Sequence, residues 1–302
     1  MSRRAYVYMH MAILLWGFTG ILGRAINMSF GSIVWYRMLI ASLGMLAIIF
    51  YRKQFQVIAW RDFLKITFTG FIVMVHWLMF YAAIKFSNVS VTLSCFASVS
   101  LFTAIMDPLM NRRKIDRIEI LLSVFVLLGI YIIFTAQHFY LKGILLSLAS
   151  AALSAVFTVN NKKFLFRYRP ELITFYELFF GWVTILVLGF FQIDLIPVDL
   201  TIPSGNDFAY LLILSLVCTT VAFSISLKAL KELNPFILNL SVNLEPIYSI
   251  VLAIIIFKEN TSLNVGFYVG TAIILASVFI HAMHTKYIMQ RGESAEAGSL
   301  TP

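Results

Sequence analysis

The chain has 302 residues, of which 61% are hydrophobic and only 12% are charged, and it carries a formal net charge of +9. Soluble globular domains are roughly half apolar and about one-quarter charged, so this composition excludes a soluble globular protein and indicates a polytopic membrane protein. The 23 basic residues are dispersed among short connectors and form no continuous stripe, which argues against a nucleic-acid partner.

Apolar windows predict ten membrane-spanning helices in an all-α fold. Most of these windows approach or reach the roughly 17 to 25 residues that cross the hydrocarbon core. The first begins just after Arg3 and Arg4 and contains no convincing cleavage site, so we expect it to remain as a span. The predicted spans are about 6–26, 32–50, 64–84, 90–110, 118–136, 143–161, 171–191, 209–228, 235–257 and 263–283.

The distribution of basic residues predicts the orientation of these spans. With the N-terminus in the cytoplasm, 18 of the 23 Lys and Arg residues fall on the cytoplasmic side, and only Arg24, Lys85, Lys142 and Lys258 lie near the outer side. The positive-inside rule therefore predicts that both termini are cytoplasmic. We expect a multi-pass protein of a bacterial inner (plasma) membrane, with residues 285–302 as a disordered cytoplasmic tail.

The first two spans carry an aromatic residue and a charge of interest. Gly17, Gly20 and Gly23 are spaced by three, which favours close helix packing and leaves Trp16 on the neighbouring face as a candidate to stack on a substrate. Arg37 enters the second span near the outer face, where its charge can snorkel to the surface. We assign Arg37 to a gate or a structural pair rather than to a binding anchor.

The third and fourth spans offer further candidates for a cavity wall. His76 lies in mid-span and is a candidate to take up and release a proton near neutral pH, although a lone histidine is as often a packing residue. Trp77 and Tyr81 are one turn apart and are candidates for an aromatic wall, with a lipid-facing position as the alternative. Ser94 and Ser98 are also one turn apart.

The sixth span carries a stripe of polar side chains on one helical face. Ser154 and Thr158 are its candidates for the cavity wall, while close helix packing through small polar residues is the alternative. Glu177, near the cytoplasmic end of the seventh span, is expected to pair with Lys163 or Arg167 and is assigned a gate or structural role. The full stripe is Ser147, Ser150, Ser154, Thr158 and Asn161.

The ninth span carries the strongest functional signal. Glu245 lies near its middle, where an ionised carboxylate costs several kcal/mol unless it is paired or faces water. Pro246 lacks a backbone donor and so leaves a carbonyl unpaired one turn earlier. Asn239 and Asn243 are one turn apart on the same span. This pattern predicts a polar, broken helix with Glu245 as a proton-coupling group; a buried carboxyl held by the asparagines without any transport role is the alternative.

The two halves of the chain contain a weak internal repeat. Aligned at a constant offset, Ala83, Lys85 and Asn88 fall on Ala229, Lys231 and Asn234. Because each half would hold five spans, an odd number, the second copy must be inverted relative to the first. We predict a first repeat at 1–137 and a second repeat at 138–284.

Five short segments match a known family of membrane proteins: Leu15–Gly17, Tyr36–Arg37, Phe80–Ile84, Leu244–Pro246 and Phe257–Glu259. On these segments the chain resembles the drug/metabolite transporter superfamily, and specifically its EamA-type exporters of two five-helix repeats. The resemblance implies a central cavity lined mainly by helices 1, 3, 4, 6, 8 and 9. One departure is that Asn111, Arg112 and Arg113 stand where the first repeat of the family usually ends its fourth helix with Glu.

We therefore predict a secondary active transporter that works by alternating access, and the resemblance implies that it exports a small metabolite, an amino acid or a related compound. Its partners would be the substrate, the lipid bilayer and coupled protons, and it would act as a monomer or a homodimer. The sequence indicates no cofactor and no metal site, and it contains no phosphate-binding loop of the GxxxxGK[ST] type. The alternative is a membrane-embedded enzyme or flippase acting on a lipid-like substrate, but no HExxH, DDxxD or GxSxG pattern supports an enzyme.

Overall fold

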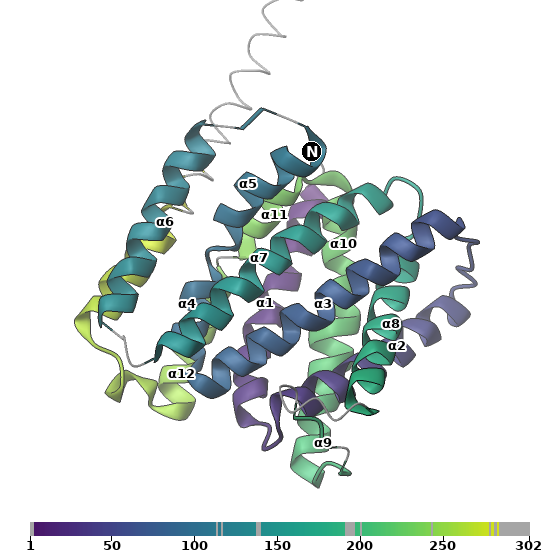
Figure 1. Cartoon of the computed structure of the whole chain (residues 1–302), viewed down its shortest axis with the longest axis horizontal. Helices are drawn as coiled ribbons and strands as arrows, with labels where there is room; N and C mark the ends of the chain where they lie inside the picture. The colour runs from purple at the N-terminus through teal and green to yellow at the C-terminus, as the bar shows by residue number, and fades with distance from the viewer. Residues whose placement is uncertain are drawn as a thin grey trace, which may run out of the picture.

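The computed structural model describes residues 3–112, 114–115, 117–136, 140–190, 197–199, 201–242, 244–277, 279–280 and 283. These residues form a bundle of helices joined by short connections, and they contain no β-strand (Figure 1). The all-α architecture predicted from composition is therefore confirmed. The expected tail at 285–302 lies outside the described residues.

The helices follow one another in the order that the apolar windows predict. Eight helical segments among the described residues are long and apolar enough to cross a membrane, and the shorter apolar helices Ile120–Ala136 and Val265–Ser277 bring the series to the ten expected spans. The first half holds α1 (Arg3–Ala25), α2 (Phe30–Tyr51), α3 (Trp60–Phe86), α4 (Val89–Phe96), α5 (Val99–Asn111) and α6 (Arg117–Ala136).

The second half repeats this series. It holds α7 (Leu141–Phe164), α8 (Pro170–Phe190), α9 (Gly205–Leu212), the π-helical segment Ile213–Val221, α10 (Ala222–Glu232), α11 (Pro235–Val242), α12 (Glu245–Phe257) and the final helix Val265–Ser277. Helices α9 and α10 form one continuous span through the π-helical segment, and α4 with α5, like α11 with α12, forms a span that breaks in the middle.

The broken spans show the duplication most directly. Helices α4 and α11 begin at residues 89 and 235, and α5 and α12 end at residues 111 and 257, so every boundary differs by the same offset. Asn88 Oδ1 accepts from the Val91 amide (2.8 Å), and Asn234 Oδ1 accepts from the Ile237 amide (2.7 Å), so both spans begin with the same asparagine cap. Both end in a left-handed residue, with φ of 53° and 54°.

The two breaks have different local causes. In the second half, Pro246 cannot donate to the carbonyl of Val242, where α11 ends. The first half has Ser100 at the matching position, and its hydroxyl bonds the Ala97 carbonyl oxygen at 3.2 Å. A side-chain hydroxyl that bonds nearby backbone offers the chain an alternative to the helical ladder.

The bundle has two chemically distinct ends. At the end that we call the basic end, α2, α5, α7 and α10 finish while α3, α8 and α11 begin. At the opposite end, the carboxylate of Glu259 accepts hydrogen bonds from the Val89 and Ser90 amides (3.1 and 3.0 Å) and from the Ser90 hydroxyl (2.6 Å). A carboxylate is stabilised there by the unpaired amides at the start of α4. Glu259 therefore ties the second repeat to the first.

Glycines bring the helices close together. A Cβ atom on Gly23 would lie 2.3 Å from the Tyr81 ring, and one on Gly20 would lie 3.0 Å from Val89, so α1 packs tightly on α3 and α4 as its glycine spacing predicts. Gly129 and Gly270 do the same for α6 and the final helix, which lie together at one edge of the bundle (Figure 1).

The close backbone approach of α3 and α8 tests this packing. Replacing Gly70 by Ala would place its Cβ 2.4 Å from the carbonyl oxygen of Glu177 on α8. Because backbone cannot move aside as a flexible side chain can, we expect Gly70→Ala to destabilise the protein by about 1–3 kcal/mol, the usual cost of overpacking. Thermal unfolding in detergent measures this loss.

Gly189→Ala is the matched control, because Gly189 lies in α8, the helix that Gly70 of α3 packs against, but nothing approaches its Cβ position within 4 Å. We expect it to be neutral or stabilising by about 0.5–1 kcal/mol. Equal melting temperatures for the two variants would contradict the packing described here.

Candidate functional site

A cavity lies between the two repeats. Side chains of α1 to α4 line one side of it, and side chains of α7 and α10 to α12 line the other. Its water-accessible volume is about 70 Å³, which is room for several water molecules at about 10–15 Å³ each. A cavity at a repeat interface, beside a broken helix, is where inverted-repeat transporters place their substrate.

Arg37 is fully buried at one wall of this cavity. Its Nε donates to the Thr219 hydroxyl (2.8 Å), one Nη donates to the Tyr81 hydroxyl (2.7 Å), and the guanidinium lies 3.9 Å from the centre of the Trp77 ring. The side chain is only 1% exposed, so it does not snorkel to the surface as its position near the outer end suggested. These bonds use two of the five guanidinium donors, and a buried cation–π contact adds to their hold.

Glu245 lines the same cavity from α12. It is 4% exposed, and no described residue donates a hydrogen bond to its carboxylate or forms an ion pair with it. It occupies the first turn of α12, where unpaired backbone amides favour a negative charge. A buried positive group and a buried negative group therefore share one cavity without a direct ion pair between them.

The polar stripe on α7 divides into two parts. All five of its residues are buried, but Ser147 and Ser150 bond Thr92 and His76 within the protein. Ser154, Thr158 and Asn161 line the cavity. The stripe thus serves close helix packing near the start of α7 and cavity lining near its end.

A short chain of hydrogen bonds continues the polar wall across to the broken spans. Thr158 Oγ1 donates to Asn239 Oδ1 (3.3 Å), and Asn239 Nδ2 donates to the Thr103 hydroxyl (2.8 Å). These bonds join α7, α11 and α5. They satisfy buried groups that would otherwise each lose free energy on leaving water.

Aromatic rings form the apolar wall. Phe223 lies at its centre, with ring centroids 5.7 Å from Trp16, 5.8 Å from Trp77 and 6.5 Å from Phe157. His76 also lines the cavity, and its Nδ1 lies 2.8 Å from the Ser150 carbonyl oxygen. Because a carbonyl oxygen can only accept, Nδ1 is the donor in this contact. The Ser150 hydroxyl in turn donates to the His76 carbonyl oxygen (3.0 Å).

Other predicted site residues lie away from the cavity lining. Ser94 bonds Thr271 at 3.0 Å, Ser98 is buried in the break between α4 and α5, and Tyr81 supports Arg37. Asn243 lies outside the described residues. The cavity brings together Trp16, Arg37, His76, Trp77, Ser154, Thr158, Asn239 and Glu245 from the sequence-based set.

Glu177 has a different partner from the one expected. Its Oε2 accepts from Asn161 Nδ2 at 3.3 Å. Arg167 instead pairs with Asp62 (3.1 Å), and Lys163 donates to the carbonyl oxygen of Met110 (3.1 Å). The expected pairing of Glu177 with Lys163 or Arg167 is therefore wrong, because both cations bond groups at the surface of the basic end.

Several lining residues were not singled out from the sequence. Four phenylalanines are among them, Phe80, Phe96, Phe157 and Phe223. No feature of the sequence separates them from the many phenylalanines that face outward. Ser226, by contrast, follows Ser215 and Thr219 on the same span at helical spacing, which offered a signal for it.

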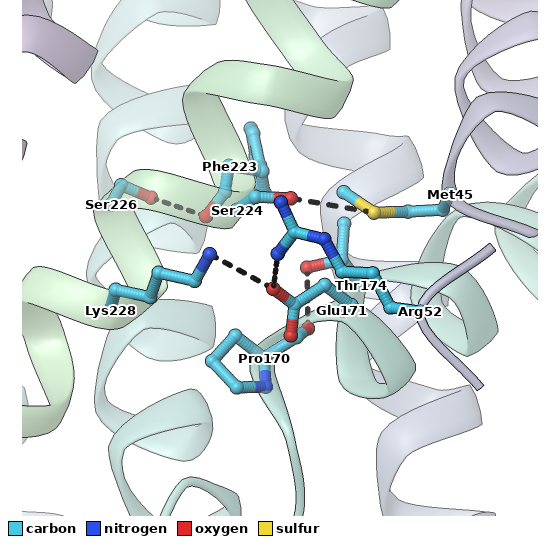
Figure 2. A network of polar contacts seen from close by, with 9 residues as sticks. All are labelled: Met45, Arg52, Pro170, Glu171, Thr174, Phe223, Ser224, Ser226 and Lys228. Carbon is cyan, nitrogen blue, oxygen red and sulfur yellow. Dashed lines mark hydrogen bonds and ion pairs between the residues drawn. The ribbon is translucent and has the colours of Figure 1, made fainter. Parts of the chain in front are cut away.

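An ion-pair cluster connects the two repeats at the basic end (Figure 2). Glu171 Oε1 on α8 lies 3.5 Å from Arg52 at the end of α2 and 3.0 Å from Lys228 on α10. The Glu171 side chain is almost fully buried, whereas Arg52 is half exposed. The cluster therefore holds the end of α2 from the first repeat against α8 and α10 from the second.

Comparisons with known proteins agree with this architecture. The model of the EamA-like transporter family matches residues 3–135 and again residues 141–283. A Clostridium kluyveri protein named an uncharacterized transporter is 26% identical over 198 residues, and the match spans 62% of each chain. A crystal structure aligns over 95% of this chain and 99% of its own with a TM-score of 0.70 and 14% identity, a likeness in fold.

The ion-pair cluster makes a prediction about stability. Glu171→Gln leaves Arg52 and Lys228 facing each other without the carboxylate, so we expect a loss of about 1 kcal/mol, small because both cations are partly exposed. The loss should shrink in high salt, which screens exposed charges. Thermal unfolding at low and high salt measures both effects.

Glu232→Gln is the control, because Glu232 is exposed at the end of α10. An equal change in both variants, or a Glu171→Gln effect that is independent of salt, would contradict a specific ion-pair cluster.

Proposed function

The chain belongs to the EamA-like transporter family, and we propose that it is a secondary active transporter that exports a small metabolite, an amino acid or a related compound, by alternating access. The observation that carries this proposal is the cavity between the repeats, which contains both Arg37 and Glu245. The family supports membrane transport in general. The substrate class is argued from the groups in the cavity.

Charge complementarity favours a zwitterion. A guanidinium binds a carboxylate with directed N–H donors, and Arg37 keeps donors beyond those that Tyr81 and Thr219 occupy. The free carboxylate of Glu245 can accept from an ammonium group. An α-amino acid carries both groups and would neutralise the two buried charges at once, which a sugar or an uncharged nucleoside cannot do.

The aromatic wall favours an apolar side chain on that amino acid. Trp16, Trp77 and Phe223 offer ring edges and faces on the same cavity. Small-molecule sites are commonly lined by aromatic side chains, with a few polar groups that fix the orientation of the ligand.

Glu245 is the proposed proton-coupling group. Binding a proton there removes a negative charge from the cavity, so proton and substrate ammonium would compete for the same carboxylate. Exchange of one for the other is the simplest way for a proton gradient to drive export. His76 is the second candidate, but its Nδ1 is already held by Ser150.

The orientation follows from charge. The basic end carries most of the Lys and Arg residues, and the positive-inside rule assigns such an end to the cytoplasm. We therefore propose a bacterial inner-membrane protein with both termini in the cytoplasm. The ion-pair cluster of Arg52, Glu171 and Lys228 would then lie at the cytoplasmic gate.

The first test identifies the ligand. We expect zwitterionic amino acids with apolar side chains to stabilise the purified protein and so raise its melting temperature. At a ligand concentration one hundred times Kd, the free energy of unfolding should rise by about 2.7 kcal/mol. Arg37→Lys should lose this shift, because an ammonium cannot reproduce the planar donors. Sugars, nucleosides and amphipathic drugs complete the panel, at two pH values.

Stabilisation by lipids alone would contradict the amino-acid assignment and favour a flippase or an enzyme with a lipid-like substrate. Hits confined to uncharged compounds, or hits retained in Arg37→Lys, would contradict the role of the charge pair.

The second test concerns coupling. In proteoliposomes, Glu245→Gln should abolish the dependence of flux on an imposed proton gradient, because the amide cannot exchange a proton. The rate of gradient-driven flux, measured with a ligand found above, provides the readout. Glu232→Gln serves as the control on an exposed carboxylate, and unchanged gradient dependence in Glu245→Gln would refute the assignment.

A further inference from the structure

A second carboxyl group is buried beside the cavity. Glu177 on α8 is 0% exposed, and its own backbone lies against Gly70 of α3, where any Cβ would be only 2.4 Å from the Glu177 carbonyl oxygen. This close approach of α3 and α8 leaves the carboxyl surrounded by protein. Nothing in the proposed coupling at Glu245 uses it.

The hydrogen bonding of Glu177 does not suit an ionised carboxylate. Among the described residues it has one donor, Asn161 Nδ2, at the long distance of 3.3 Å. Glu177 Oε1 and Asn161 Oδ1 are both buried acceptors with no partner. An ionised carboxylate and an amide oxygen can only accept, so this pair of side chains contains more acceptors than it can satisfy.

A proton on Glu177 resolves this shortage. The neutral acid has one O–H donor, which can bond Asn161 Oδ1 while Asn161 Nδ2 donates in return. Exchanging Oδ1 and Nδ2 of Asn161 does not remove the need for this proton. The exchange would place Oδ1 against Glu177 Oε2, and two acceptors can form a hydrogen bond only if one of them carries a proton. Buried polar groups in folded proteins nearly always find partners, and an orphaned acceptor costs about 1–3 kcal/mol.

Glu259 and Glu171 show what an ionised carboxylate looks like in the same protein. Glu259 accepts three hydrogen bonds at 3.1 Å or less, and Glu171 is held by two cations. Glu177 has neither arrangement. The difference lies in the donors around each group and not in burial, since all three are less than 10% exposed.

Charged side chains on the packed helices are engaged elsewhere. Arg52 and Lys228 hold Glu171, Asp62 accepts from Arg167 and Tyr168, Lys162 and Lys163 donate to backbone carbonyls, and Lys65 lines a separate groove at the basic end. No ion pair of Glu177 is present among the described residues. Among the described residues, none of these cations therefore forms an ion pair that would stabilise its negative form.

Asn161 connects this group to the cavity. It lines the cavity itself, and it lies one turn after Thr158, which bonds Asn239. A polar wall thus runs from the broken ninth span to Glu177. A proton released from Glu177 would enter the cavity near the basic end, whereas Glu245 lies near the middle of the ninth span.

We propose that Glu177 is a second proton-binding site of the transport cycle, held as a neutral acid against Asn161 in this conformation. Its participation in coupling rests on the proposed function, whereas its protonation does not. Release transfers one proton from the carboxyl oxygen to water in the cavity and leaves a carboxylate. The resulting carboxylate of Glu177 needs a hydrogen-bond donor that this conformation lacks. Release of the proton therefore requires α7 and α8 to move relative to each other.

Infrared difference spectroscopy of the purified protein tests the protonation without any transport assay. The C=O stretch of a neutral carboxylic acid is distinct from the bands of carboxylates. We expect Glu177→Gln to remove a neutral-acid band that Glu245→Gln retains, and Asn161→Leu to shift the frequency of that band by removing its partner. Glu171→Gln, which removes an ion-paired carboxylate, should leave this region unchanged. If the spectrum of Glu177→Gln in the neutral-acid region is identical to that of the unmodified protein, the proposal is overturned.

Flux in proteoliposomes tests the coupling. We expect Glu177→Gln to reduce the number of protons moved per substrate and to keep substrate binding, measured as the ligand-induced rise in melting temperature. Loss of the infrared band with an unaltered proton stoichiometry would overturn the coupling role. If Glu245→Gln leaves coupling intact while Glu177→Gln lowers it, the assignment of Glu245 fails and that of Glu177 stands.

Discussion

Hydrocarbon offers no hydrogen-bond partner, and this single constraint accounts for where the polar side chains of the bundle lie. Arg37, Glu177 and Glu245 sit at depths where lipid contact would be costly, and each is turned toward protein or cavity. The surface that remains for lipid is apolar. Polar groups collect between the two repeats because that interface can supply partners for them. The lipid hydrocarbon that requires helices to satisfy their own backbone groups thus also drives polar side chains into the cavity.

The duplication gives this interior its shape. Two spans break at equivalent positions, one in each repeat, and the broken ends bring backbone amides and carbonyls to the middle of the bundle. Proline causes one break, and a serine hydroxyl assists the other. Because the architecture is retained while its local cause differs, the break itself is the feature that the fold requires. Glu245 lies at the start of a helix only because of it.

Much of the fold could be predicted from the sequence, because hydropathy reports depth along each span and helical spacing reports a polar face. The break after Phe96 could not, since the proline of that span, Pro108, lies near the end of α5 and the sequence around Phe96 resembles an uninterrupted helix. The position of a residue along a helix predicts its depth in the membrane but not the direction in which its side chain points. For this reason Glu177 was expected to pair with the surface cations Lys163 or Arg167. The gathering of Trp16, Trp77 and Glu245 on one cavity follows from the ninth-span and aromatic patterns, whereas Phe157 and Phe223 look like any lipid-facing phenylalanine.

The carboxylate of Glu259 has a consequence for how the protein divides its time between conformations. In a perfectly symmetric inverted repeat, the two proposed states open to opposite sides would be related by a two-fold rotation and would have equal free energies. Glu259 fastens the start of α4, but the equivalent position in the first repeat is occupied by Arg113 and so provides no matching carboxylate for α11. In the proposed alternating-access cycle the two states would therefore be unequal, and each 1.4 kcal/mol of difference would change their ratio tenfold. A departure from symmetry of this kind would set the resting state of such a cycle before any substrate binds.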